Sequence, residues 1–236
     1  MSMVHAGSLS GTVAAVEEHV FWGKSIRAKE RDEVARWLAG RQGLPGAYAG
    51  TFALFDSERR DGVRLFTGER VKSAAARHIM GEETMRALRM LKVTGAAAAA
   101  LQRAAEGIRL PPVGAAEPRP QDGQVHWLWE WQAGTYCCGA CSVALWRNML
   151  AGGFDRQEER LAVGLRCLRR CRKGGGQWRL FPYWYTMSAL AEMDLKEAVE
   201  EMRYGAQRCE QTAKRVAGNV WAVRRGELAR RVLGRI

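Results

Sequence analysis

Apolar residues recur at three- and four-residue steps along much of this chain, which is the spacing of one buried face of an α-helix. The clearest case is the segment 73–93, where Ala74, Ile79 and Leu88 belong to such a face. Further segments carry the same periodicity: 96–108, 138–150, 156–172, 183–193, 196–207 and 211–232. Strand-like alternation is hard to find. We therefore predict an all-α fold built from helix pairs.

Glycine and proline divide these segments. Gly152-Gly153 and the run 174–176 are predicted to stop helices, and Asp155 and Asp194 are candidate N-caps. The stretch after Ile108 holds four of the six prolines, so it cannot be the interior of a helix. Three regions follow. We expect an N-terminal helical lobe at 1–109, a proline-rich connection at 110–123, and a C-terminal helical lobe at 124–236 that packs on the first to form one globular unit.

A second pattern is a glycine, one intervening residue and an aromatic residue, placed before a helix or a compact apolar segment. It occurs at 46–48, 134–136 and 176–178. The first two copies begin 88 residues apart and the last two 42. These separations suit a period of about 44 residues with one degenerate copy, and such periods are typical of stacked helical arrays. Chance recurrence is the alternative with three copies.

One copy carries a family resemblance. The stretch 37–48, Trp-Leu-Ala-Gly-Arg-Gln-Gly-Leu-Pro-Gly-Ala-Tyr, resembles the repeat of the squalene cyclase and protein prenyltransferase superfamily, in which a glutamine precedes Gly-x-aromatic. Gln42, Gly46 and Tyr48 match that repeat. The segment 176–190 is similar to the next repeat boundary, although Arg and Lys stand where the glutamine is expected. The resemblance covers residues 34–206 and implies an α/α-toroid-like arrangement, complete or incomplete.

The resemblance does not extend to that family's chemistry. Its cyclases use an Asp-x-Asp-Asp acid, whereas the six aspartates of this chain are isolated from one another. The zinc set of the prenyltransferases needs a histidine downstream of its cysteine, and no histidine follows His126. The fold is therefore expected to carry over without the function.

Aromatic side chains are concentrated between residues 127 and 185, where six of the nine tryptophans lie. Tryptophan lines apolar pockets and also fills ordinary cores. Our leading hypothesis is an aromatic-lined cavity that binds an apolar small molecule or a peptide, and core packing is the alternative. The candidate lining residues are Trp127, Trp129, Trp131, Tyr136, Trp178, Trp184 and Tyr185.

An enzyme is the second hypothesis. Cys-Gly-Ala-Cys at 138–141 fits part of the papain-type nucleophile turn, with Cys141 near a helix N-terminus that would lower a thiol pKa. The candidate catalytic residues are Cys141, His126 and Glu130. A papain-like enzyme needs a downstream histidine, which the chain lacks. A small buried cysteine at a helix start is the alternative.

Two sets of residues could hold a metal. Cys138, Cys141, Cys167 and Cys171 offer the four thiolates that suit zinc. His78 and Glu82 lie four apart on a predicted helix, so both side chains could face one ligand, although such a pair is also a common surface contact. No other cofactor is predicted, because the glycine run at 174–176 lacks the features of a phosphate-binding loop.

The net charge of +12 is unevenly distributed. The segment 212–236 holds seven basic residues against Glu227 alone, so it carries half of the net charge. A helix of this kind could bind an anionic partner such as nucleic acid, although a solvated basic face is the alternative. The candidate residues are Arg224, Arg225, Arg230 and Arg231.

The N-terminal residues lack the basic and apolar regions of a secretion signal, and no stretch has the roughly 18 apolar residues of a membrane span. The six cysteines are accordingly expected to be reduced thiols or ligands. We expect a cytoplasmic protein without a membrane span.

Overall fold

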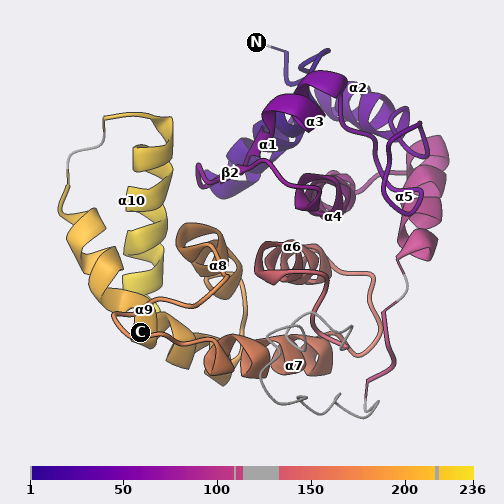
Figure 1. The fold of residues 1–236 in the computed structure, drawn as a ribbon. Helices are drawn as coiled ribbons and strands as arrows, with labels where there is room; N and C mark the ends of the chain where they lie inside the picture. Colours follow the sequence, from indigo (N-terminus) through magenta and orange to yellow (C-terminus); the bar gives the residue numbers. More distant parts are fainter. Residues whose placement is uncertain (1, 109, 114–132, 216–217) are drawn as a thin grey trace. The chain divides into compact units, whose positions relative to one another are not determined.

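The protein is described by a computed structural model that covers residues 2–108, 110–113, 133–215 and 218–236. Ten α-helices and one two-stranded antiparallel sheet make up the regular structure of these residues (Figure 1). The prediction of an all-α fold is confirmed. A helix-pair repeat and a toroid-like arrangement stay predictions. Among the described helices, none has both the length and the apolar character needed to cross a membrane.

The chain divides into two compact units. The first unit comprises Met1–Phe66, Arg70–Arg109 and Arg147–Gly153, and the second comprises Thr67–Glu69, Leu110–Trp146 and Phe154–Ile236. The main division falls between residues 109 and 110, where the sequence predicts the start of the connection. Two short segments depart from that simple order, because 67–69 belongs to the second unit and 147–153 to the first.

The first unit is a cluster of helices around α4. Its elements are α1 (Leu9–Phe21), α2 (Ala28–Ala39), α3 (Asp56–Asp61), β1 (Val63–Arg64), β2 (Arg70–Val71), α4 (Ala75–Met90) and α5 (Gly95–Gly107). Helix α4 packs against α1, α2 and α5. This helix is buried over most of its circumference. Small residues such as Gly81 and Ala87 are therefore buried in it together with large ones such as Met85 and Leu88. The strands pair Val63 with Val71.

The second unit is arranged around α9. It contains α7 (Gln157–Arg170), α8 (Tyr183–Leu190), α9 (Lys196–Ala213), α10 (Val220–Leu233) and the first two turns of α6 (Gly139–Leu150). Helix α9 packs against α7, α8 and α10 (Figure 1). Every residue of α8 is buried, in keeping with its almost wholly apolar and aromatic sequence. The core of this unit is therefore built on α8 and covered by α9 and α10.

The predicted helix boundaries between residues 207 and 220 are wrong. The break expected between 207 and 211 does not occur, since α9 runs on to Ala213 and α10 begins at Val220. The side chain of Asn219 caps α10 by accepting a hydrogen bond from the Ala222 N–H at 3.0 Å.

The expected aspartate caps are also wrong. Arg156 and Leu195 occupy the N-cap positions of α7 and α9. The Asp155 carboxylate instead accepts hydrogen bonds from Arg160, at 3.0 Å to each oxygen. The Asp155 carboxylate thus accepts from the Arg160 guanidinium, and not from the backbone N–H groups at the start of α7 as an N-cap would.

The glycines of the Gly-x-aromatic pattern meet different physical demands. Gly46 and Gly176 adopt left-handed backbone angles, with φ of 88° and 67°. Gly134 is required by close approach instead, because a side chain there would clash with the carbonyl oxygen of Arg160. The same sequence pattern therefore requires glycine for two different reasons, a left-handed backbone angle or close packing against another segment.

Candidate functional site

The predicted aromatic set is divided between the core and one pocket. Trp127, Trp129 and Trp131 lie outside the described residues. Three others are buried in the second unit: Tyr136, Trp178 and Tyr185. Trp178 is held there by a hydrogen bond from its indole nitrogen to Glu201 at 2.8 Å. Among the described members of the set, Trp184 lines the pocket described next.

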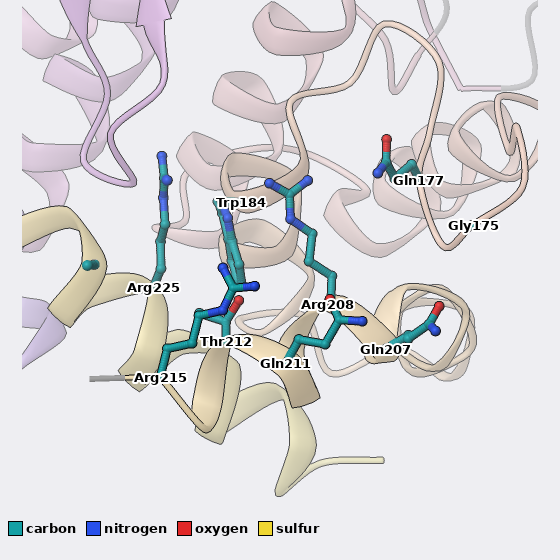
Figure 2. Close-up of a pocket in the computed structure, with 10 residues that line it drawn as sticks. Gly175, Gln177, Trp184, Gln207, Arg208, Gln211, Thr212, Arg215 and Arg225 are labelled. Atoms are coloured by element: carbon teal, nitrogen blue, oxygen red, sulfur yellow. The ribbon is translucent and has the colours of Figure 1, made fainter. Parts of the chain in front are cut away.

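That pocket has a volume of about 450 Å³ and lies within the second unit. Its lining is mainly polar. The residues are Gly175, Gln177, Trp184, Gln207, Arg208, Gln211, Thr212, Arg215, Ala222 and Arg225 (Figure 2). In the view of Figure 2 the Trp184 indole lies between the side chains of Arg225 and Arg208. We call this feature the arginine pocket.

Four chain segments supply the arginine pocket. Helix α9 contributes a stripe of polar residues that begins at Gln207 and ends two residues beyond the helix, at Arg215. These residues share a helix face because they follow three- and four-residue steps. Trp184 comes from α8 and Arg225 from α10, while the loop before α8 contributes Gln177.

Two arginines of the pocket are positioned by neighbouring groups. The Arg208 guanidinium lies 4.7 Å from the ring centre of Tyr183 and 5.7 Å from that of Trp184, which is the geometry of a cation–π contact. The Arg225 Nε donates to the Thr67 carbonyl oxygen at 2.6 Å, and its Nη2 lies 4.0 Å from a Glu69 oxygen. Both cations are thus held near the pocket before any ligand arrives.

The electrostatic balance of the pocket is positive. No acidic residue is among the side chains that line it. Among the described residues, Arg225 is the lining arginine with a carboxylate within 4.0 Å, that of Glu69, whereas Arg208 and Arg215 form no such ion pair. Unneutralised guanidinium groups bind phosphate and carboxylate oxygens through paired N–H donors. The glutamine amides add neutral donors and acceptors.

The other predicted arginines are mostly engaged elsewhere. Arg230 and Arg231 both form ion pairs with Glu227, at 3.0 and 2.9 Å. Arg224 does not line the arginine pocket, whereas Arg225 does. The basic C-terminal segment therefore contributes to the pocket through Arg215 and Arg225.

The predicted catalytic set is partly visible. Cys141 is fully buried in the first turn of α6, with its Sγ 3.3 Å from the Sγ of Cys138. His126 and Glu130 lie outside the described residues. Cys167 on α7 and Cys171 at the C-cap of that helix are both buried and interact through their side chains. Within the described chain these two cysteine pairs do not gather into one four-thiolate cluster.

His78 and Glu82 have separate surroundings on α4. The His78 ring packs against Tyr48 with 3.8 Å between ring centres, and desolvation followed by the charge of Arg77 lowers its pKa. Glu82 is completely buried, and its Oε2 accepts a hydrogen bond from Asn148 Nδ2 at 2.6 Å. Desolvation raises the pKa of Glu82 to about 7.

No family model, curated protein or solved structure matches this chain. Function is therefore inferred from the chemistry of its own residues.

Most residues of the arginine pocket were not predicted from the sequence. Gln207, Arg208, Gln211, Thr212 and Arg215 are a polar stripe at helical spacing, but the predicted break after 207 divided it between two helices. A single helix drawn from 196 to 213 would have placed the first four of them on one face. The remaining signal, an aromatic helix packed beside that stripe, depends on tertiary structure.

Proposed function

We propose that the second unit binds a small organic phosphate in the arginine pocket. The observation that carries this proposal is the presence of three lining arginines with no acidic residue among the lining side chains. A phosphate group offers several acceptor oxygens to such donors, and each charge-assisted hydrogen bond is stronger than a neutral one.

The size of the pocket supports a small ligand. Pockets for small molecules and cofactors commonly measure roughly 300–1,000 Å³, and this one measures about 450 Å³. The amides of Gln177, Gln207 and Gln211 would bind the polar remainder of the ligand, since each offers both a donor and an acceptor. An organic phosphate of nucleotide size fits these dimensions.

The pocket favours this ligand over the apolar one expected from the sequence. Trp184 is its one aromatic lining residue, and only 4% of that residue is exposed. An apolar ligand would have to cover three guanidinium groups without giving them acceptors, which costs free energy for each group that loses water. The apolar molecule or peptide remains the competing hypothesis.

Isothermal titration calorimetry at low salt can test the proposal with AMP, ATP and inorganic pyrophosphate as probes. We expect binding that weakens as salt is added, because screening reduces the attraction between phosphate and arginine. Arg208→Gln and Arg215→Gln should each raise Kd by about tenfold, and the double variant should raise it by about a hundredfold.

Arg166→Gln provides the matched control, because Arg166 is exposed on α7 of the same unit and does not line the pocket. Its Kd should equal that of the unaltered protein. Absence of measurable heat with all three probes would overturn the proposal. Saturable binding of an uncharged naphthylamine dye in that case would favour the apolar ligand.

A further inference from the structure

Cys138 and Cys141 stand at the two ends of a Cys-x-x-Cys segment at the start of α6. Cys138 immediately precedes the helix, and Cys141 lies in its first turn. The first backbone N–H groups of a helix have no partner within the helix, and they carry partial positive charge. The Cys141 N–H accordingly points at sulfur, donating to the Cys138 Sγ at 3.4 Å.

The turn that carries these thiols is tied down by hydrogen bonds. The Ser142 hydroxyl accepts from the Tyr136 N–H at 2.9 Å and donates to the Tyr136 carbonyl oxygen at 3.1 Å. The Ser142 N–H donates to the Cys138 carbonyl oxygen at 2.8 Å. The positions of both sulfur atoms are therefore set by the backbone on each side of them.

The sulfur atoms are close enough to form a bond after a small movement. They lie 3.3 Å apart, and a disulfide bond measures about 2.05 Å. A rotation of the two side chains supplies the difference. The pair is thus arranged for reversible oxidation within one helical turn.

The two thiols differ in exposure. Cys138 is half-buried, whereas Cys141 is fully buried. Of these two thiols, Cys138 is the one that can meet an incoming molecule from solvent, and Cys141 can reach a sulfur already attached to Cys138. This asymmetry separates an attacking thiol from a resolving thiol.

The electrostatics support the same division of roles. The hydrogen bond from the Cys141 thiol, joined by backbone N–H groups, lowers the pKa of Cys138 to about 6 despite partial burial. The pKa of Cys141 is raised by its thiol neighbours Cys137 and Cys138 and by burial. Both shifts favour ionisation of the Cys138 sulfur over that of the Cys141 sulfur.

The surroundings offer a contact surface for a substrate. Gly139 has no side chain because the Leu180 carbonyl oxygen occupies that space. The Leu180 side chain itself is 53% exposed, which is high for a large apolar residue. It lies in the loop whose backbone meets the start of α6 at Gly139, so an exposed apolar residue stands on the segment packed beside Cys138.

We propose that Cys138 and Cys141 are a thiol–disulfide exchange pair that reduces a disulfide of a small thiol compound or a peptide. The Cys138 thiolate attacks one substrate sulfur, the substrate S–S bond breaks, and the departing thiolate leaves a mixed disulfide on Cys138. Cys141 then gives its proton to a departing thiolate and attacks the Cys138 Sγ, which releases the second substrate thiol. The substrate gains two electrons, and the cysteine pair becomes a disulfide.

The test uses the full reduced chain, incubated without oxygen with oxidised glutathione in one arm and a disulfide-linked peptide in the other. Samples are quenched with acid, alkylated and mapped by mass spectrometry. We expect a disulfide between Cys138 and Cys141 in at least one arm, and the arm that reacts identifies the source of the substrate. Cys141→Ser should stop at a mixed disulfide on Cys138, and Cys138→Ser should react at least about tenfold more slowly.

Cys209→Ser is the control, since Cys209 lies in the same unit and its thiol contacts the Tyr183 hydroxyl at 3.3 Å rather than the proposed pair. This variant should react like the unaltered protein. A disulfide between Cys137 and Cys141 would overturn the proposed pair, as would the absence of any disulfide in both arms. Stoichiometric zinc that protects these thiols in the purified protein would equally overturn it, because the cysteines would then be ligands.

Discussion

Glu82 is a buried carboxyl group whose ionisation should weaken the first unit as pH rises. It lies on α4 with no exposed surface, and Asn148 donates to its Oε2 at 2.6 Å. No group in the described part of the chain donates to its Oε1. Desolvation raises the pKa to about 7 from a usual value of 4.5, although the hydrogen bond from Asn148 acts in the opposite direction.

The sign and the size of the effect follow from these two pKa values. The folded protein holds the Glu82 proton more tightly than the unfolded chain does. Its stabilising contribution is therefore fully present below pH 4.5 and is lost as pH rises through about 7. At 1.36 kcal/mol for each pH unit between the two values, the free energy of unfolding should fall by roughly 3 kcal/mol.

Replacing Glu82 by glutamine isolates this effect. The amide oxygen of Glu82→Gln can still accept from Asn148, and the group no longer titrates. We compare free energies of unfolding in urea from about pH 5 to about pH 8, with hydrogen exchange on α4 peptides to localise the change. The variant should gain roughly 3 kcal/mol relative to the unaltered protein across that range.

Any fixed cost of the amide cancels in this comparison, because it is the same at every pH. A difference between the two proteins that stays constant over the whole range would refute the reasoning. It would mean that Glu82 is ionised when folded at all these pH values, with a donor at its Oε1.

Three further predictions concern buried groups, each measured as the free energy of unfolding in urea. Arg147→Met should cost about 3–5 kcal/mol, because Arg147 is fully buried between two buried carboxylates, and a cost below about 1 kcal/mol would contradict this. Gly134→Ala should cost more than about 2 kcal/mol, since the methyl group meets the Arg160 carbonyl oxygen, and a neutral change would show that the backbones separate freely. Trp178→Phe should cost about 2–3 kcal/mol through loss of the hydrogen bond to Glu201, and an unchanged stability would mean that this bond contributes nothing.

Helix positions were readable from the sequence where one face is apolar and a glycine ends the segment. The segment 73–93 predicted α4, and 96–108 predicted α5, each within three residues at either end. Gly152 and Gly153 indeed have left-handed backbone angles after α6. These features depend on local chemistry alone, so the sequence contains the information needed.

Helices of the N-terminal region were not assigned from the sequence. Helix α2 is predominantly charged, with only Val34, Ala35 and Leu38 buried, so its apolar face is narrow. Helix α3 is six residues long, and its start is fixed by Glu58, whose carboxylate accepts from the Phe55 N–H at 3.1 Å. Neither helix shows a long apolar period, and packing on neighbours stabilises both.

The aromatic residues show the limit of composition as evidence. Trp178 and Trp184 are alike in the sequence, both large and both close to α8. In the structure Trp178 is a core residue hydrogen-bonded to Glu201, and Trp184 forms one wall of the arginine pocket. Which of them meets a ligand is decided by the side chains packed around each one. Aromatic density alone therefore could not tell a core residue from a pocket residue.

For the arginines, unlike the aromatic residues, the local sequence partly separates those that pair within the protein from those that line the pocket. Arg230 and Arg231 follow Glu227 by three and four residues, the spacing at which helical side chains pair, and both indeed bind that carboxylate. Arg208 and Arg215 have no acidic residue at either spacing in the sequence, and both line the pocket. Net charge counts all four arginines equally. If the arginines with an acidic residue three or four positions away are set aside, Arg208 and Arg215 remain as cations available to a ligand. The residues that could bind an anion were thus marked by the absence of a carboxylate three or four residues away, and the fold then placed them beside Trp184.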